Sequence, residues 1–214
     1  DGPSGAGKGT ISQMLALELD WNILDSGALY RTLAYFMKEN NINLDNFKQN
    51  RDLLKERFNV SFDPGIPGEP VRVMFEKQDI TQIVRTEEIA KITSNLAADP
   101  AIREFIKPCQ RDFMLAPGLI ADGRDMGTVI FPDAKHKIFL TASVEERSKR
   151  RQTQLKTQGL EVNMRSLLLK LEERDKKDTE RKYSPLIPAD DSVIIDTTYL
   201  NPEGVVNKIK TYLK

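Results

Sequence analysis

Residues 1–10 constrain the fold of this chain more than any other stretch. They place glycines at positions 2, 5, 7 and 9 around Lys8, in the order Gly-x-x-x-x-Gly-Lys. Glycines let a backbone curl so that successive N–H groups point at one anion, and Lys8 adds a mobile positive charge for nucleotide phosphates. A helical pattern follows, and its positive N-terminal end would face the same anion. A plain glycine-rich turn explains neither the lysine nor the helix, so we predict a phosphate-binding loop.

The composition excludes several classes of protein. The 214 residues carry 32 basic and 32 acidic side chains, which gives no general attraction to nucleic acids or acidic membranes. A single cysteine, Cys109, argues against a disulfide framework, and a single histidine, His136, argues against a Ser-His-Asp triad. No apolar run reaches the roughly 20 residues of a membrane span. We expect a cytoplasmic monomer without a nucleic-acid or membrane partner.

Four short apolar runs alternate with helical patterns. They lie at residues 21–24, 119–122, 137–140 and 193–196, an alternation that predicts a parallel sheet flanked by helices. Because a phosphate loop normally follows a buried strand, we expect one more strand upstream of Asp1. The predicted fold is a three-layer α/β/α arrangement of the P-loop NTPase type with a five-stranded parallel sheet.

Two segments interrupt this alternation. Residues 60–81 read as a β-hairpin with a proline- and glycine-rich turn, and we interpret them as part of an inserted subdomain. Residues 146–182 are rich in arginine and contain Gly159 as a hinge, as a mobile lid needs. Residues 1–59, 82–145 and 183–214 form the predicted core domain. Further helices are expected over 44–59, 86–98, 100–115 with a kink at Pro108, and from Pro202 to Leu213.

Charged residues follow two of the predicted strands. Asp25 and Arg31 come after the run at 21–24, and Asp122 ends the run at 119–122. Since the ligand crevice of an open parallel sheet lies outside the carboxyl ends of its strands, these side chains are expected beside the phosphate loop. Asp122 stands where a carboxylate that organises Mg²⁺ is usual. The next residues, Arg124 and Asp125, either face a ligand or pair with each other.

A third cluster of charged residues lies at the C-terminal end of the predicted lid. Residues 145–182 hold twelve basic and eight acidic side chains, most of them typical of a solvated helix. Arg174, Asp178 and Arg181, however, are spaced i, i+4 and i+7, so they are expected to share one helix face. Two guanidiniums on one face suit the phosphates of a phosphoryl-transfer reaction. The His-Arg-Asp and Asp-Phe-Gly motifs of protein kinases are absent from the sequence.

With these motifs the chain resembles the bacterial cytidylate kinases, P-loop enzymes that phosphorylate CMP and dCMP with ATP. The resemblance runs from Asp1 to about Asp196. Its motifs are residues 1–10, Leu24-Asp25-Ser26-Gly27-Ala28-Leu29-Tyr30-Arg31, Ala121-Asp122-Gly123-Arg124-Asp125-Met126-Gly127-Thr128, Lys137-Ile138-Phe139-Leu140, Glu173-Arg174-Asp175 and Ser184-Pro185-Leu186.

The resemblance implies two nucleotide sites. An ATP site is implied at Gly2, Pro3, Ser4, Gly5, Ala6, Gly7, Lys8, Gly9 and Thr10. A CMP site is implied at Ser26, Tyr30, Arg31, Ser94, Arg103, Arg124, Asp125, Asp178 and Arg181. Lys8, Arg124, Arg174 and Arg181 are the expected catalytic residues. Within the family pattern Ser94, Arg103, Arg124 and Asp125 correspond to the readers of cytosine, Arg31 and Arg181 to phosphate ligands, and Asp178 to a sugar-side carboxylate.

The expected cofactor is Mg²⁺ bound with ATP. Gly9 occupies the position of the usual metal-contacting hydroxyl, so the ion is expected to be held through the phosphates, with Thr10 or Asp122 reaching it through water. Two alternatives stay open. One is another small-molecule P-loop kinase acting on UMP, AMP or a sugar acid. The other is a nucleotide-dependent switch or binding protein that transfers no phosphate.

Overall fold

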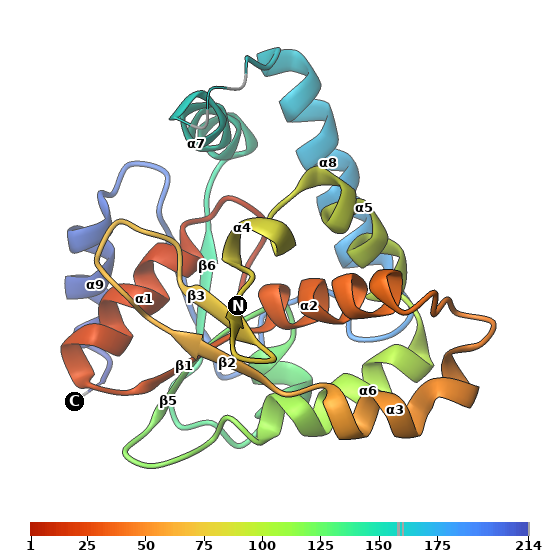
Figure 1. Ribbon diagram of the computed structural model, residues 1–214. Coiled ribbons are helices and arrows are strands. Elements are labelled where there is room, and N and C mark those ends of the chain that lie inside the picture. Colours follow the sequence, from red (N-terminus) through yellow and green to blue (C-terminus); the bar gives the residue numbers. More distant parts are fainter. Residues whose placement is uncertain (158, 160, 214) are drawn as a thin grey trace. The chain divides into compact units, whose positions relative to one another are not determined.

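The computed structural model of the protein describes residues 1–157, 159 and 161–213. Gln158 and Leu160 of the predicted lid and Lys214 of the predicted core domain lie outside the described residues. The chain divides into two compact units (Figure 1): a first unit of residues 1–11 and 123–214, and a second unit of residues 12–122. Helix α1 (Lys8–Leu19) begins in the first unit and continues into the second. None of the helices in the described ranges is long and apolar enough to cross a membrane.

The second unit is built around α2, whose inner side is apolar. Leu29, Leu33 and Phe36 are at most 1% exposed, and α2 packs against α5 and α6 (Figure 1). In chain order the elements of this unit after α1 are β1 (Asn22–Asp25), α2 (Ser26–Glu39), η1 (Phe47–Asn50), α3 (Arg51–Arg57), β2 (Val60–Asp63), β3 (Arg72–Phe75), β4 (Gln78–Asp79), α4 (Thr81–Val84), α5 (Glu87–Leu96), α6 (Pro100–Arg111) and β5 (Leu119–Asp122).

Two sheets belong to the second unit. Strands β1 and β5 pair in parallel, with Asp25 opposite Asp122, so two carboxylates end neighbouring strands at the same edge. Strands β2 and β3 pair antiparallel, as the sequence predicts, and β4 adds a third strand. The ring of Phe75 on β3 packs edge-on against Phe36, at 5.7 Å between centroids. Gln13 Nε2 of α1 donates to Ile66 O at 3.2 Å and so holds the hairpin turn.

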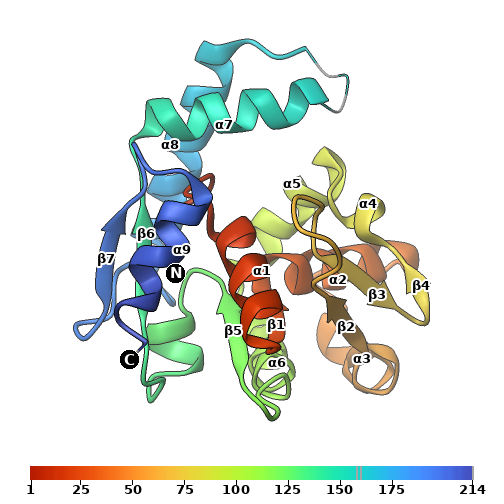
Figure 2. The same ribbon diagram turned by 90° about the vertical axis from the view of Figure 1, so that its left-hand side faces the viewer.

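The described residues 123–213 of the first unit form a parallel strand pair, the π-helix η2 and three α-helices. Figure 2 shows α9 on one face of the β6–β7 pair, where Val205, Val206 and Ile209 are buried. The predicted start of α9 is confirmed, because Asn201 Oδ1 accepts from Gly204 N at 2.8 Å and Pro202 opens the helix. In chain order these elements are the π-helix η2 (Met126–Ile130), β6 (Ile138–Thr141), α7 (Val144–Thr157), α8 (Met164–Glu180), β7 (Val193–Asp196) and α9 (Pro202–Lys210).

Helices α7 and α8 form the helical pair of the predicted lid. They pack against each other and bury Leu155, Leu167 and Leu171. Asn163 caps α8, since its Oδ1 accepts from Ser166 N at 3.2 Å. Gly159, in the connection between the two helices, has a positive φ of 76° that glycine adopts readily.

The predicted five-stranded sheet is not what the described strands form. The four core strands are present within one residue of their predicted positions, but they form two separate parallel pairs, β1–β5 and β6–β7. Beside β6 the next backbone is that of Asp1, whose carbonyl accepts from Leu140 N at 2.8 Å. Asp1 N also donates to Ile138 O at 2.8 Å, so this residue is held against β6 by its backbone.

Three predicted helices are shorter than expected. The segment 44–59 gives only η1 and α3, because Asn43 and Asn46 bond the backbone N–H groups of each other and so compete with a helical turn. Helix α6 ends at Arg111 rather than at residue 115, and α9 ends at Lys210 rather than at residue 213.

Candidate active site

The phosphate loop has the backbone that its glycines permit. Gly2, Gly5 and Gly7 have φ values of 141°, 81° and 93°, a region that L side chains rarely adopt. A Cβ atom on Gly2 would lie 2.0 Å from Leu140 O, so a side chain has no room there. The loop is therefore shaped by glycine conformation and by close packing on β6.

Lys8 folds back across this loop. Its Nζ donates to Pro3 O at 2.9 Å, and the residue is 8% exposed. A second anchor comes from the end of β7, where the buried Thr197 Oγ1 donates to Ala6 O at 3.1 Å. Arg150 Nη2 of α7 in turn donates to Thr197 O at 2.6 Å. The phosphate loop is thus held by Lys8 at Pro3 and by Thr197 at Ala6.

Arginines of the first unit gather around the C-terminal part of α8. Arg124 Nε lies 3.0 Å from Asp178 Oδ2, and Arg181 Nη1 lies 3.7 Å from Asp178 Oδ1. Arg124 thus pairs with a carboxylate on α8. Asp125 is 3% exposed just before η2. The structure thus brings together three of the predicted residues.

Arg174 belongs to the same cluster. Burial, and next the charge of Arg124, lower the pKa of its guanidinium, while Asp178 opposes the shift. The side chain still reaches solvent and a guanidinium keeps its proton in proteins, so Arg174 stays charged. One detail of the prediction is wrong: Arg181 does not share a helix face with Arg174, because α8 ends at Glu180 and Arg181 has an extended backbone.

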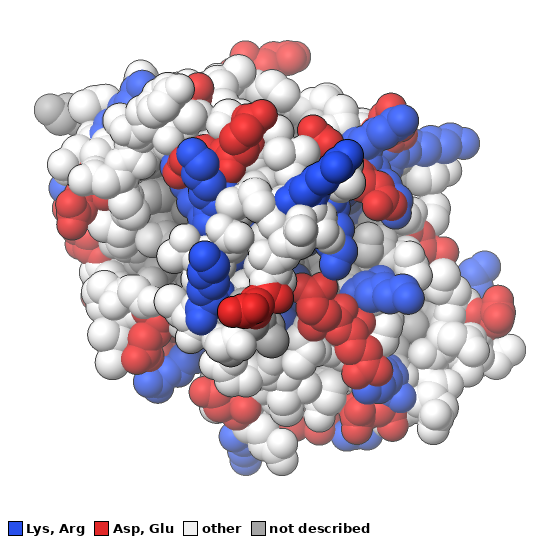
Figure 3. All heavy atoms as spheres, turned by 90° about the horizontal axis from the view of Figure 1, so that it is seen from above, with Lys and Arg blue, Asp and Glu red and all other residues white. Residues whose placement is uncertain are grey.

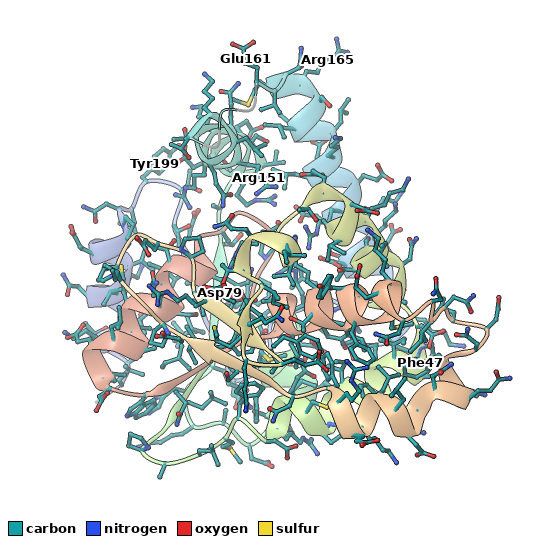
Figure 4. All side chains as sticks on the ribbon, in the orientation of Figure 1. Phe47, Asp79, Arg151, Glu161, Arg165 and Tyr199 are labelled. Carbon is teal, nitrogen blue, oxygen red and sulfur yellow. The ribbon has the colours of Figure 1, made fainter. Side chains whose placement is uncertain are left out.

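The arginines of α7 are not among the predicted site residues. Arg151 is close enough to Arg174 to lower the pKa of Arg174, and Figure 4 shows Arg151 on the side of α7 opposite to Glu161 and Arg165. Arg147 donates to Ser4 O of the phosphate loop, and Arg150 donates to Thr197 O after the end of β7. Their spacing of i, i+3 and i+4 could have indicated one functional face, but a basic helix pattern is more often a solvated surface.

In the second unit, Asp25 and its neighbours order the start of α2. Asp25 Oδ1 accepts from Ala28 N at 2.8 Å and caps the helix. Burial first, and the nearby Asp122 second, raise the pKa of Asp25, while Arg85 at 3.7 Å opposes the shift. Arg31 Nη1 donates to Val84 O at 3.0 Å on α4.

The other predicted CMP ligands of this unit lie on its helices. The Arg103 guanidinium stacks over the Tyr30 ring at 5.7 Å and donates to Ala97 O at 2.9 Å. Ser26 is buried, and its Oγ lies 2.8 Å from Gln110 Nε2. Ser94 is exposed on α5. Tyr30 and Arg103 are therefore brought together, while Ser26 and Arg31 bond other elements.

The carboxylates of Asp25 and Asp122 suit a hard cation that is also bound by ligands from outside the protein. Asp25 and Asp122 are oxygen donors whose like charges oppose each other, which a divalent cation would relieve. Among the described residues, no group of three or more His, Cys, Asp or Glu side chains could hold a metal. Such an ion would therefore need phosphate oxygens and water as well, as expected for Mg²⁺ bound with a nucleotide.

Comparisons with known proteins show the family of this chain. The sequence model of the family described as cytidylate kinase matches residues 1–214. Two similar curated relatives are a cytidylate kinase of Pseudomonas paraeruginosa, 47% identical over 98% of this chain and 91% of its own, and one of Shewanella halifaxensis, 47% identical over 100% and 92%. A cytidylate kinase of Shewanella baltica is 50% identical over 92% of this chain and 86% of its own. The chain therefore belongs to the cytidylate kinase family.

Proposed function

We propose that this protein transfers the γ-phosphoryl group of ATP to CMP or dCMP and releases ADP with CDP or dCDP. The observation that carries the proposal is the arginine cluster of the first unit, in a chain of the cytidylate kinase family. Arg124, Arg174 and Arg181 gather around Asp178 in the unit that also holds the phosphate loop. Several cations with few countercharges suit a group that carries negative charge on many oxygens.

In the proposed reaction the loop holds the donor. Residues 2–10 bind the ATP phosphates through backbone N–H groups, and the Lys8 ammonium exchanges its contact with Pro3 O for the β- and γ-phosphates. An oxygen of the monophosphate forms a bond to the γ-phosphorus while the bond to the β-phosphate oxygen breaks. The acceptor oxygen is already ionised near neutral pH, so no general base is required.

The arginines stabilise the group in transfer. Arg124, Arg174 and Arg181 are assigned to the charge that spreads over the equatorial phosphoryl oxygens. Mg²⁺ bound with ATP would supply further charge neutralisation, and Thr10 or Asp122 would reach it through water.

We propose that the monophosphate is bound by nine residues: Ser26, Tyr30, Arg31, Ser94, Arg103, Arg124, Asp125, Asp178 and Arg181. An arginine that donates to cytosine O2 or N3 and an aspartate that accepts from N4 make a donor–acceptor order that uracil cannot satisfy. We therefore propose a preference for CMP over UMP. We also propose that the enzyme works as a monomer in the cytoplasm.

A panel of acceptors tests the activity. The protein is incubated with ATP, Mg²⁺ and, separately, CMP, dCMP, UMP, AMP or a sugar acid, and ADP is measured. CMP and dCMP are expected to release ADP fastest. Faster release with another acceptor would make the protein a different small-molecule kinase. ATP binding without ADP release for any acceptor would favour the nucleotide-dependent switch.

A variant tests the proposed cytosine reader. Asp125→Ala is expected to lower kcat/KM for CMP by about 10- to 100-fold, the discrimination typical of a good base contact. Asp133→Ala, which removes an exposed carboxylate from the same region, is the control and should leave kcat/KM unchanged. If Asp125→Ala folds normally and still turns over CMP like the unaltered protein, the assignment is wrong.

A further inference from the structure

Arg147 joins three parts of the first unit with one guanidinium. The side chain starts in the first turn of α7 and is only 7% exposed. Its Nε donates to Ala142 O at 3.0 Å, after the end of β6, and its Nη1 donates to Ser4 O of the phosphate loop, also at 3.0 Å. The same Nη1 lies 2.6 Å from Asp175 Oδ2 on α8. A Cβ atom on Gly5 would lie 3.0 Å from Arg147 Cβ, so the loop backbone also packs on this residue.

Asp175 is the partner on α8, and its surroundings are unusual for a carboxylate. Its Oδ1 is buried and has no hydrogen-bond partner among the described residues. A buried carboxylate is costly unless nearby cations compensate it. Here Arg147 contacts it directly, and Asp175 raises the pKa of Arg174, against the lowering by Arg124 and Arg151. Asp175 therefore acts as a countercharge within the arginine cluster.

We propose that Arg147 and Asp175 are positioning residues that fix the turn of α8 carrying Arg174 against the phosphate loop. The proposal rests on the proposed kinase function, but the residues differ from those assigned to either nucleotide. Arg147 Nη1 contacts both Ser4 O of the phosphate loop and Asp175 Oδ2 of α8. A shift of α8 would therefore also move the guanidinium that contacts Ser4. The pair thus sets the distance between the bound phosphates and a catalytic arginine.

The expected effect is on the chemical step. A misplacement of about 1 Å can lower a rate by about 10²-fold, since phosphoryl transfer depends on the positions of its charged partners. Asp175→Asn keeps the shape of the side chain and removes its charge. We expect this variant to lower kcat about tenfold or more, with a much smaller change in KM for CMP.

A double-variant cycle separates positioning from general destabilisation. The variants are Asp175→Asn, Arg174→Gln and both together, with kcat and melting temperature measured for each. If Asp175 acts through Arg174, Asp175→Asn lowers kcat in the unaltered protein but by less than about twofold when Arg174 is already changed. Equal losses in both backgrounds would overturn the proposal. Glu173→Gln is the matched control, because Glu173 pairs with Lys177 on the exposed side of the same helix and should leave kcat unchanged.

A second measurement does not depend on activity. In ¹⁵N-labelled protein the Arg147 Nε–H signal, identified by its loss in Arg147→Lys, should exchange slowly with water because the group is buried and hydrogen-bonded. Asp175→Asn should shift this signal and speed its exchange, while Glu173→Gln should not. An unchanged signal in Asp175→Asn would show that the pair does not hold Arg147. If the unaltered protein fails to turn over CMP but Asp175→Asn still shifts the Arg147 signal, the proposed function is wrong, while the contact between Arg147 and Asp175 is supported.

Discussion

Asp25 carries two opposing contributions to stability. Its carboxylate caps α2 through Ala28 N, which favours the folded state. Burial and the charge of Asp122 raise its pKa above the ordinary 3.8, so the charged form is less favourable in the folded protein than in the unfolded chain. Near neutral pH the charge of Asp25 therefore lowers the stability of the folded protein. We attribute this cost to the position of Asp25 at the end of β1, opposite Asp122 at the end of β5.

We expect Asp25→Asn to increase the free energy of unfolding near neutral pH, and the gain to shrink as the pH falls. The folded protein binds this proton more tightly, so the cost is absent below pH 3.8 and appears as the pH rises from 3.8 through the raised folded-state pKa. Asparagine caps a helix about as well as aspartate, so the cap is kept. Urea unfolding over a range of pH values measures the effect.

Asp79 on β4, labelled in Figure 4, provides a control of opposite sign. A hydrogen bond with Thr81 lowers the pKa of Asp79, so its stabilisation is present above pH 3.8 and is lost as the pH falls through the folded-state pKa. Asp79→Asn should therefore destabilise the protein near neutral pH and have little effect in acid. A gain for Asp25→Asn that is equal at every pH would contradict the assignment.

At single residues, the sequence predicted what is local and missed what is distant. The glycines and Lys8 are recognisable because their spacing in ten consecutive residues fixes their geometry. Arg147 is different, since its contact with Ser4 joins residues 143 positions apart and nothing in the basic pattern of α7 distinguishes it. The pairing of Arg124 with Asp178 could not be predicted for the same reason, although each residue was a predicted site residue.

At the scale of elements, α6 shows how a helix can tolerate a local defect. Asp99 caps it strongly, with Oδ1 accepting from both Ala101 N and Ile102 N. Pro108 lies inside the helix and cannot donate a backbone hydrogen bond, yet α6 continues to Arg111. Since Pro108 is exposed and close to the helix end, its cost is expected to be below the roughly 3 kcal/mol of a helix interior.

We expect Pro108→Ala to stabilise the protein by about 1 kcal/mol, because alanine restores the missing N–H donor and has high helix propensity. Thermal unfolding measures the gain. Glu104→Ala, one turn earlier on the exposed side of α6, is the control and should change stability little. A lower melting temperature for Pro108→Ala would mean that the packing of Ile106 and Gln110, which are buried, needs the proline at position 108.

Elements were easier to predict than their assembly. The strands at 119–122 and 193–196 have the predicted bounds because short apolar runs between turn residues are a local signal. Whether strand pairs join into one sheet depends on backbone contacts between distant segments, and the described core strands form two separate pairs. The helix expected over 44–59 failed where side chains of Asn43 and Asn46 bonded the backbone.

At the scale of the whole molecule, charge is balanced and mixed. The 32 basic and 32 acidic residues cancel, and on the face drawn in Figure 3 Lys and Arg side chains lie beside Asp and Glu rather than in one continuous patch. Attraction for nucleotide phosphates therefore has to come from the local arginine cluster of the first unit. The two units consequently differ in what they offer: the first contains the loop and the arginines of α7 and α8, and the second contains Tyr30 stacked with Arg103.

Hydrogen exchange with each nucleotide alone tests this division. ATP with Mg²⁺ should slow amide exchange mainly in the first unit, at residues 2–10 and in α7 and α8, because bound phosphates order the loop and its anchors. CMP alone should slow exchange in segments of both units, at residues 26–31 and 94–103 and in the C-terminal part of α8. In Asp125→Ala the response to CMP should weaken while that to ATP persists, which separates monophosphate binding from donor binding. Protection by CMP confined to the first unit would contradict the roles proposed for Tyr30 and Arg103, since their guanidinium–ring contact lies wholly in the second unit.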